Sequence, residues 1–388
     1  MTEYIKTPEL RFPEFTEKLI LQELNSVASV TMGQSPKSSN YTDDSKQMTL
    51  VQGNADLKNG KINSRIYTTE ITKIAKVQDI ILTVRAPVGE LAIAQKEVCI
   101  GRGVCAIKAN KFVYYFLEKL KINKLWTRLS QGSTFEAISG NDIKNINVTL
   151  PSKKEQIKIG DFFSKLDRQI ELEEEKLELL EQQKRGYMQK IFSQELRFKD
   201  ENGDEYPNWK TSQLGEITKT FSGGTPKSNN ASYYNGDIPF IRSGEISKQF
   251  TELKITENAL NNSSAKLVEK GDLLYALYGA TSGEVAISKI NGAINQAVLC
   301  IKSKESISFL LNFLKLQKQH ILKTYIQGGQ GNLSASIVKG ITIKLPCREE
   351  QTKIGNFLDK VEILIEKQST KVELLKQRKQ GLLQKMFV

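Results

Sequence analysis

The sequence predicts a mixed α/β fold, in which two similar α/β domains are each followed by a long helix and the two helices pair as an antiparallel coiled coil with pseudo-two-fold symmetry. Three observations lead to this fold class. The block 150–192 returns as 345–387, at an offset of 195 residues, with 21 of 43 letters identical and no gap. Both blocks carry apolar residues at heptad spacing, and the segments before them share short motifs in the same order. Such self-similarity within one chain indicates a duplication.

The two globular segments follow one plan. Both open with the letters LRF, continue with a Pro-Lys-Ser loop and an alternating apolar segment, reach a Gln-Gly loop and end on a strand-like run before the helix. The alternating segments, which begin at Asp79 and Asp272, predict strands around a turn. The two segments share the order of their motifs but differ in most of their residues, which indicates one scaffold adapted to two targets. The expected parts are a first domain at 1–150, a first helix at 151–195, a second domain at 196–345 and a second helix at 346–388.

Each repeated block predicts a helix of roughly 38 residues, about 57 Å long, which would serve as a spacer of fixed length. Pro151 and Pro346 precede the two helices. Ser152 and Glu155 form a capping-box pattern, in which each side chain satisfies the backbone N–H of the other residue. Cys347 replaces the serine in the second copy, so we expect a weaker cap there.

A heptad seam follows both helices. Polar residues interrupt it at matching positions, Glu173 and Lys184 in the first copy and Gln368 and Lys379 in the second, and such residues fix register and orientation. We expect the helices to pair with each other, because an internal partner is present at high effective concentration; a coiled coil between chains is the alternative. The apolar and aromatic seam residues are Ile159, Phe163, Leu166, Ile170, Leu177, Leu180, Tyr187, Ile191, Ile354, Leu358, Val361, Ile365, Val372, Leu375, Leu382 and Met386.

The composition favours a polyanionic partner. The 388 residues carry a formal net charge of +12, and an excess of this kind most often serves nucleic-acid binding. No apolar run approaches the roughly 18 residues of a membrane span and the first residues lack a signal-peptide layout, so we expect a cytoplasmic protein with no membrane partner. We expect the cysteines, which form no CxxC pair, to be reduced thiols. They are Cys99, Cys105, Cys300 and Cys347.

The sequence argues against a catalytic subunit. The only histidine, His320, lies on a predicted helix and completes no catalytic constellation. No phosphate-binding loop, dinucleotide-binding motif or Pro-Pro-aromatic run of adenine methyltransferases is present. Asp237 with Glu252 and Lys254 resembles a nuclease pattern, which arises easily in a chain this charged. We predict no catalytic residue, no cofactor and no metal site.

Basic, amide and aromatic side chains in the loops are the candidates for DNA contact. Arg matches guanine in the major groove, Gln matches adenine, and Lys mostly meets phosphate. Arg85 and Tyr278 occupy matching positions after the first alternating strand. Because their side chains differ in chemistry, we expect this position to read different bases in the two halves of the target. The candidates are Lys37, Tyr41, Arg85, Arg102, Arg128, Gln131 and Ser133 in the first domain and Lys219, Thr225, Lys227, Tyr233, Tyr234, Arg242, Ser243, Tyr278, Gln296, Gln327 and Gln330 in the second.

Two runs in the second half resemble a known family. GGTPKSNNASYYNGDIPFIRSGEI looks like the opening of a target-recognition domain, and QGGQGNLSASIVKGITIKLPCREEQTKIGNFLDKV looks like its close and the start of its helix. The whole layout resembles the specificity subunit of Type I restriction–modification systems. The resemblance implies a non-catalytic adaptor for double-stranded DNA, with two target-recognition domains that read the halves of a bipartite, asymmetric sequence.

The resemblance also implies partners. Two methyltransferase subunits, which bind S-adenosylmethionine and methylate adenine, would dock on the near-equivalent helices, and restriction subunits would supply ATP- and Mg-dependent translocation and cleavage. Three other interpretations remain open: the specificity subunit of a related multi-subunit Type II system, a coiled-coil scaffold without DNA binding, and a nuclease or methyltransferase in its own right.

Overall fold

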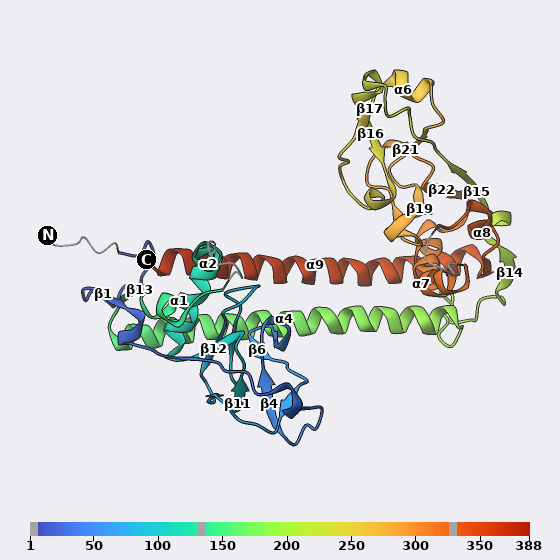
Figure 1. The fold of residues 1–388 in the computed structure, drawn as a ribbon. Coiled ribbons are helices and arrows are strands. Elements are labelled where there is room, and N and C mark those ends of the chain that lie inside the picture. The colour runs from blue at the N-terminus through green and yellow to red at the C-terminus, as the bar shows by residue number, and fades with distance from the viewer. Residues whose placement is uncertain (1–6, 131–136, 326–331) are drawn as a thin grey trace. The chain divides into compact units, whose positions relative to one another are not determined.

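The computed structural model describes residues 7–130, 137–325 and 332–388. The chain forms two compact units, one of residues 1–174 with 370–388 and one of residues 175–369. Each unit holds one globular domain, the beginning of the long helix that follows it and the end of the other long helix (Figure 1). This confirms the predicted mixed α/β fold with two long helices that pack together.

The first globular domain is built on two sheets and one separate antiparallel pair of strands. A six-stranded sheet has the order β2-β12-β9-β10-β6-β5, a five-stranded sheet has the order β3-β7-β4-β11-β8, and β1 pairs with β13. The strands are β1 (Ile20–Glu23), β2 (Ser29–Met32), β3 (Tyr41–Thr42), β4 (Met48–Val51), β5 (Leu57–Lys58), β6 (Lys61–Ile62), β7 (Tyr67–Thr68), β8 (Ile74–Ala75), β9 (Ile80–Thr83), β10 (Leu91–Ile93), β11 (Val98–Ile100), β12 (Val104–Lys108) and β13 (Asn147–Leu150).

The central strand β9 separates two apolar layers in this domain. Ile80 and Leu82 face a core shared with the helices, whereas Ile81, one residue apart, faces the cluster between the two sheets. This follows from the two-residue period of a strand. Both faces of β9 are therefore buried, and its four residues do not alternate between buried and exposed as the sequence pattern predicted. The helices of this part of the chain are α1 (Lys111–Ile122), α2 (Leu125–Ser130), α3 (Gly140–Lys144) and the long α4 (Lys153–Phe192).

The second globular domain repeats this plan. Two four-stranded sheets have the orders β15-β22-β19-β20 and β17-β16-β21-β18, and β14 pairs with β23. Its strands are β14 (Lys210–Gln213), β15 (Thr218–Ser222), β16 (Tyr234–Ile241), β17 (Lys254–Ile255), β18 (Lys266–Val268), β19 (Leu273–Ala276), β20 (Val285–Ile287), β21 (Gly292–Ile294), β22 (Val298–Ser303) and β23 (Thr342–Leu345). Its helices are α5 (Leu214–Ile217), α6 (Glu257–Asn261), α7 (Ile307–Tyr325), α8 (Ala335–Lys339) and the long α9 (Arg348–Met386).

The long helices bury a seam against each other. Most predicted seam residues are buried or half-buried. Tyr187 is an exception, because it is 40% exposed while Met188 is buried instead. In the second copy Leu383 is fully buried and Leu382 only partly. The predicted seam is therefore wrong at Tyr187, whereas Ile191 and Met386, the last predicted seam residues of the two helices, are buried as expected.

The polar interruptions of the seam set an antiparallel register. In one unit Lys184 donates to Glu362 at 2.5 Å, and in the other Lys379 pairs with Asp167 at 2.6 Å. These are the same pair in the two copies, since 195 residues separate the corresponding positions. Glu173 is likewise paired, with Lys371 at 2.5 Å. Each of these polar seam residues thus pairs with a charged residue of the other helix, which is how it can specify the register.

A buried carboxylate anchors each long helix to the domain before it. Glu155 accepts two hydrogen bonds from Arg11, at 2.8 and 2.7 Å. Glu350 accepts from Arg197 at 3.2 and 2.8 Å and from the indole N–H of Trp209 at 3.0 Å. Both arginines belong to the LRF letters that open each domain.

The predicted capping box is therefore wrong for α4. Its glutamate, Glu155, binds Arg11 and does not reach back to the backbone of Ser152. Only the serine half of the pattern is present, as a long contact of 3.5 Å from the Glu155 N–H to the Ser152 hydroxyl. Sequence spacing could not reveal the competing arginine, which lies 144 residues away.

Glycines in the first turns let each long helix approach its own domain. A Cβ on Gly160 would lie 2.8 Å from the Cβ of Lys111, at the start of α1. A Cβ on the equivalent Gly355 would lie 3.1 Å from the Cβ of Ser308, in α7. The letters KIG of the repeat are therefore accounted for inside the chain, by close helix packing.

Two further findings bear on the predictions from composition. The cysteines are free thiols, and burial raises the pKa of Cys105 and Cys300 to about 12. Among the residues described, no helix has a stretch apolar enough and long enough to cross a bilayer.

We predict that Lys379→Met destabilises the first unit in a pH-dependent way. Lys379 is 12% exposed and also donates to Glu118 at 2.7 Å. Burial raises the pKa of Glu118 above its ordinary value, and the Lys379 ammonium offsets part of that rise. Without the Lys379 ammonium the pKa of Glu118 rises further. The free-energy cost of the substitution is therefore small below pH 4.5, where Glu118 is protonated in both states, and it grows as the pH passes through the raised pKa of Glu118. Urea unfolding should show a loss of about 2 kcal/mol at pH 8.

The matched control for this variant is Lys376→Met. Lys376 pairs with Glu174 at 2.6 Å on the exposed side of the same helices. Its loss should cost less than about 1 kcal/mol at every pH, because surface pairs contribute little. Equal losses in the two variants, or a Lys379→Met loss that does not change with pH, would contradict the buried-pair account.

Candidate nucleic-acid interface

Four segments of the first domain form one cradle, which we define as the loop 33–37, the turn after β4, the turn after β9 and the turn between β11 and β12. They enclose a hollow of about 230 Å³. The Arg102 N–H donates to the Ser35 hydroxyl at 3.0 Å, which ties the first segment to the last. The hollow is lined by Ser35, Gln52, Gly53, Arg85, Ala86, Arg102 and Gly103.

Glycines allow the cradle segments to meet backbone to backbone. A Cβ on Gly33 would lie 2.1 Å from the Gly101 carbonyl oxygen, and a Cβ on Gly103 would lie 2.0 Å from that of Gln52. Neither position tolerates a side chain without moving the backbone. The glycines thus fix the spacing between the residues that line the hollow.

The second domain contains the same cradle. Gly223 is the equivalent of Gly33, and a Cβ on it would lie 1.8 Å from the Ile294 carbonyl oxygen. Thr225 occupies the place of Ser35, and its hydroxyl donates to Gln296 at 2.7 Å. We define this second cradle as the loop 223–227, the turn after β16, the turn after β19 and the turn between β21 and β22.

Strand registers make the correspondence residue by residue. Val51 pairs with Ile100 across β4 and β11, as Ile241 pairs with Ile294 across β16 and β21. The residues that follow, Gln52 and Arg242, are therefore equivalent.

The ladders around the central strands extend this correspondence. Thr83 pairs with Val104 in the first domain, as Ala276 pairs with Val298 in the second. Counting outward from these pairs makes Arg85 equivalent to Tyr278 and Arg102 equivalent to Gln296. The predicted matching places of Arg85 and Tyr278 are confirmed.

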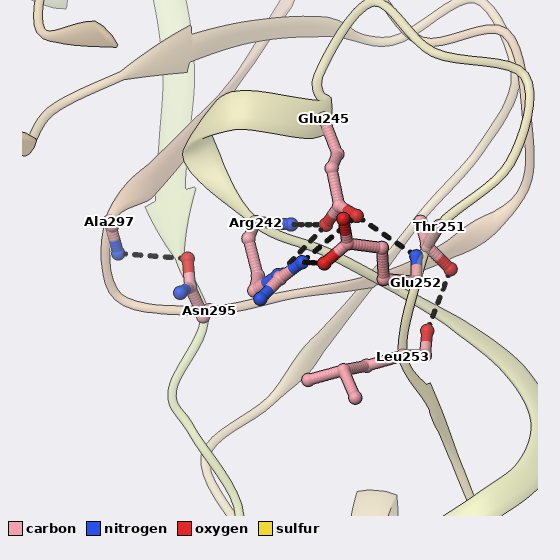
Figure 2. Close-up of polar contacts among 7 residues, drawn as sticks. All are labelled: Arg242, Glu245, Thr251, Glu252, Leu253, Asn295 and Ala297. Atoms are coloured by element: carbon pink, nitrogen blue, oxygen red, sulfur yellow. Dashed lines mark hydrogen bonds and ion pairs between the residues drawn. The ribbon is translucent and has the colours of Figure 1, made fainter. Parts of the chain in front are cut away.

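Arg242 is the most strongly held cation of the second cradle. Figure 2 shows its guanidinium facing the carboxylates of Glu245 and Glu252. The hydrogen bonds that Arg242 donates to Glu245 and Glu252 raise the pKa of Arg242 above its ordinary value. Burial would raise the pKa of Glu245, but hydrogen bonds from Arg242 and from the Glu252 N–H lower it below its ordinary value. Both groups are therefore charged at neutral pH.

The cations of the first cradle are exposed and unpaired. Within the part of the chain that the structure describes, neither Arg85 nor Arg102 makes an ion pair, and both side chains reach solvent beside the hollow. Lys37 and Lys227 are exposed at equivalent places in the two Pro-Lys-Ser loops. Such cations, free of internal partners, are suited to phosphate or base edges.

Other predicted residues lie near the cradle with an internal role. The hydroxyl of Tyr234 donates to the Pro226 carbonyl at 2.8 Å, and that of Tyr41 lies 3.4 Å from the Pro36 carbonyl. Both tyrosines therefore hold the Pro-Lys-Ser loops. Ser243 is half-buried in the turn after Arg242.

Three predicted residues are not part of a cradle. Arg128 is on α2, where it donates to the Asn123 carbonyl at 3.1 Å. Lys219 is opposite Lys302, near the end of β15 that is remote from the cradle. Tyr233 packs against a small apolar cluster. Gln131, Ser133, Gln327 and Gln330 lie outside the described residues.

Sequence reasoning missed Gln52 and Ser35, which line the first hollow. A usable signal was the apolar run MTLV, since a buried strand that ends on an amide and a glycine places that amide at a sheet edge. In the nuclease-like pattern, Glu252 is paired with Arg242. No cluster of three or more metal-binding side chains occurs in the segments described.

The comparison with known families matches most of the chain. Residues 21–182 and 206–376 match the family model of the Type I restriction modification DNA specificity domain. The chain is 26% identical over 274 residues to the EcoR124I/EcoR124II specificity subunit of Escherichia coli, which covers 66% of this chain and 63% of that one. It is 27% identical over 225 residues to the MjaIX specificity subunit of Methanocaldococcus jannaschii, covering 54% and 52%.

The first of the curated relatives, a Methanocaldococcus jannaschii chain assigned as the MjaX type I specificity subunit, is 35% identical over 176 residues. The chain spans about half of the length of the curated relatives it matches, between 41% and 63%. The fold is also similar to that of the S subunit of a Type-I restriction-modification system from M. genitalium. That similarity has a TM-score of 0.64 at 18% identity and covers 99% of both chains.

Proposed function

The chain belongs to the family of Type I restriction–modification DNA specificity subunits, and on that premise we propose that it reads a bipartite, asymmetric DNA sequence, one part with each globular domain. In this family the chain is the component that determines target recognition and is itself non-catalytic. The observation that carries the proposal is the pair of cradles. Their strand registers correspond, yet Gln52, Arg85 and Arg102 stand where the second domain has Arg242, Tyr278 and Gln296.

The difference between the cradles is what makes the proposed target asymmetric. Two identical cradles would favour two copies of one half-site, whereas an exchange of Arg for Tyr and of Gln for Arg changes the base edges that each cradle matches. The exposed Lys37 and Lys227 supply phosphate contacts that position each domain without reading sequence.

We propose that two methyltransferase subunits dock on equivalent faces of the long helices. Several letters of the repeat are exposed, and the hydrogen bonds of Gln182 and Gln377 go only to Glu178 and Glu373 of their own helices. Leu179 is 53% exposed and Leu374 is 59% exposed, although both belong to the repeated block. Spacings of three and four residues place them on one face with the repeated letters that follow, opposite the seam. This docking stripe comprises Leu179, Gln182, Gly186 and Gln189 on α4 and Leu374, Gln377, Gly381 and Gln384 on α9.

The glycines are the strongest indication within the stripe. A glycine inside a helix costs about 1 kcal/mol relative to alanine, so it needs a reason. For Gly160 and Gly355 the reason is close packing inside the chain, but no described atom lies within 4 Å of a Cβ built on Gly186 or Gly381. Close approach of a helix from another subunit supplies the missing reason. In this assembly the methyltransferase subunits bind S-adenosylmethionine and methylate adenine, and restriction subunits bring ATP and Mg.

We further propose that the paired helices set the gap between the two half-sites. Inserting one turn of four residues into both helices lengthens each by about 6 Å, which corresponds to roughly one or two base pairs. We expect the unread gap to grow by that amount and both half-sites to stay unchanged, as measured by sequencing methylated adenines. A change in the half-sites at constant gap would show that the helices do not act as a ruler.

The docking stripe predicts that Gly186→Leu weakens assembly with the methyltransferase subunit at least tenfold, because the new side chain blocks the close approach. Helix stability should not fall, since leucine favours helix over glycine by about 1 kcal/mol. Isothermal titration of the isolated chain with the methyltransferase subunit measures the affinity. The matched control is Gln183→Leu, which adds the same side chain on the flank of the stripe. Equal affinity of both variants and the parent would remove the stripe from the interface.

Lys227→Ala tests whether the second Pro-Lys-Ser loop contacts phosphate. We expect weaker binding of the assembled complex to every DNA sequence, with the slope of log affinity against log salt smaller by about one. Fluorescence anisotropy on specific and random duplexes at several salt concentrations measures both quantities. A loss confined to one base pair of the target would instead make Lys227 a reader of sequence.

A further inference from the structure

The residue that directly follows the strand leading into each cradle differs in chemistry between the domains. Arg242 follows β16 and Gln52 follows β4, and both begin a short turn that a buried carboxylate closes. Asp56 accepts from the backbone N–H groups of Gln52 and Gly53, at 2.6 and 3.2 Å. Glu245 accepts from the Arg242 backbone N–H at 3.2 Å. The turn is one residue longer in the first domain, but the residue at its start is held in the same way.

The fold also holds the side chain of Arg242. Its Nε donates to one oxygen of Glu245 at 3.0 Å and its Nη2 donates to the other at 3.2 Å, so the two groups form a fork. The Glu245 side chain is only 4% exposed, and the Glu252 N–H donates to it at 2.9 Å. Glu245 is therefore fixed before any ligand arrives, and it fixes the plane of the guanidinium.

The Nη1/Nη2 edge of the same guanidinium remains for a ligand, in a side chain that is 37% exposed. Among the described residues Nη1 has no hydrogen-bond partner, and the second hydrogen of Nη2 goes to Glu252, whose side chain is 69% exposed (Figure 2). A surface carboxylate presents two acceptor oxygens in a plane. The O6 and N7 acceptors of guanine in the major groove have the same character, and arginine matches them with two parallel hydrogen bonds.

We propose that Arg242 reads a guanine in the half-site of the second domain, that Glu245 is its positioning residue, and that Glu252 occupies the reading edge until DNA replaces it. The equivalent Gln52 reads an adenine in the other half-site, because a glutamine amide matches the N6 and N7 of adenine. The inference rests on the proposed DNA-reading function and adds to it the residue and the base class in each domain.

The test is an exchange between the two domains. Arg242→Gln and Gln52→Arg are each co-expressed with the methyltransferase subunit, and methylated adenines are mapped by sequencing. We expect Arg242→Gln to change the preference at one position of one half-site from guanine toward adenine, with about ten- to hundredfold loss on the parental site. Gln52→Arg should change one position of the other half-site in the reverse sense. Parental motifs in both variants would overturn the inference.

If Arg242→Gln gives no methylation, the conservative variant Arg242→Lys tests whether Arg242 reads the base. Arg242→Lys keeps the charge beside Glu245 but loses the fork. A relaxed preference at a single position supports the proposal, and an unchanged motif overturns it.

The role of Glu245 has its own readout. Glu245→Gln should lower discrimination at the same position as Arg242→Gln and leave other positions alone. A uniform loss across both half-sites, with a lower Tm, would mark Glu245 as purely structural.

A substitution of Glu252 should change DNA affinity in the opposite direction. Glu252→Gln should strengthen binding of the assembled complex to the parental DNA several-fold, because it removes a competing negative charge from the reading edge. A purely structural clamp predicts a lower Tm and no gain in affinity.

The parental chain separates this inference from the proposed function. Absence of any two-part motif with the parent would contradict the proposed function, whereas a two-part motif without guanine in one half-site would contradict only the inference.

Discussion

A buried lysine on each long helix requires a carboxylate from the other helix, and this requirement sets the register on which the other contacts depend. Lys184 meets Glu362 in one unit and Lys379 meets Asp167 in the other. A slip along the seam would leave these ammonium groups unpaired in apolar surroundings, at a cost of several kcal/mol. With the register held, the start of α4 and the end of α9 share one hydrophobic core, and the start of α9 and the end of α4 share another.

The repeat can now be divided by the role of its letters. The family resemblance implies that the near-equivalent helices each dock one methyltransferase subunit. The structure assigns part of the match between the two blocks to contacts inside the chain, because Glu155 and Glu350 bind arginines and Gly160 and Gly355 admit the neighbouring helix. What remains is the docking stripe, in which no described atom lies within 4 Å of a Cβ built on Gly186. The sequence identity of the two blocks, taken alone, would therefore have assigned too many of their residues to a partner's binding surface.

Periodicity predicted the fold class and most of the seam, because both follow from local spacing. It failed where distant residues compete. The capping box was lost to Arg11, and Tyr187 gave way to Met188 because the helix end packs against a domain core. The cradles were harder still. Parallel pairing of β4 with β11 brings Gln52 beside Arg102, and no sequence spacing encodes that pairing.

The most direct test of the account maps methylation directed by the parental chain. It would be co-expressed with its methyltransferase subunit in a host free of adenine methylation, and methylated adenines would be identified by sequencing. The account predicts one motif of two unlike parts separated by a gap of fixed length. A continuous motif, two identical halves, or no methylation from a folded and associated complex would contradict the claim that the two cradles read different halves of one target.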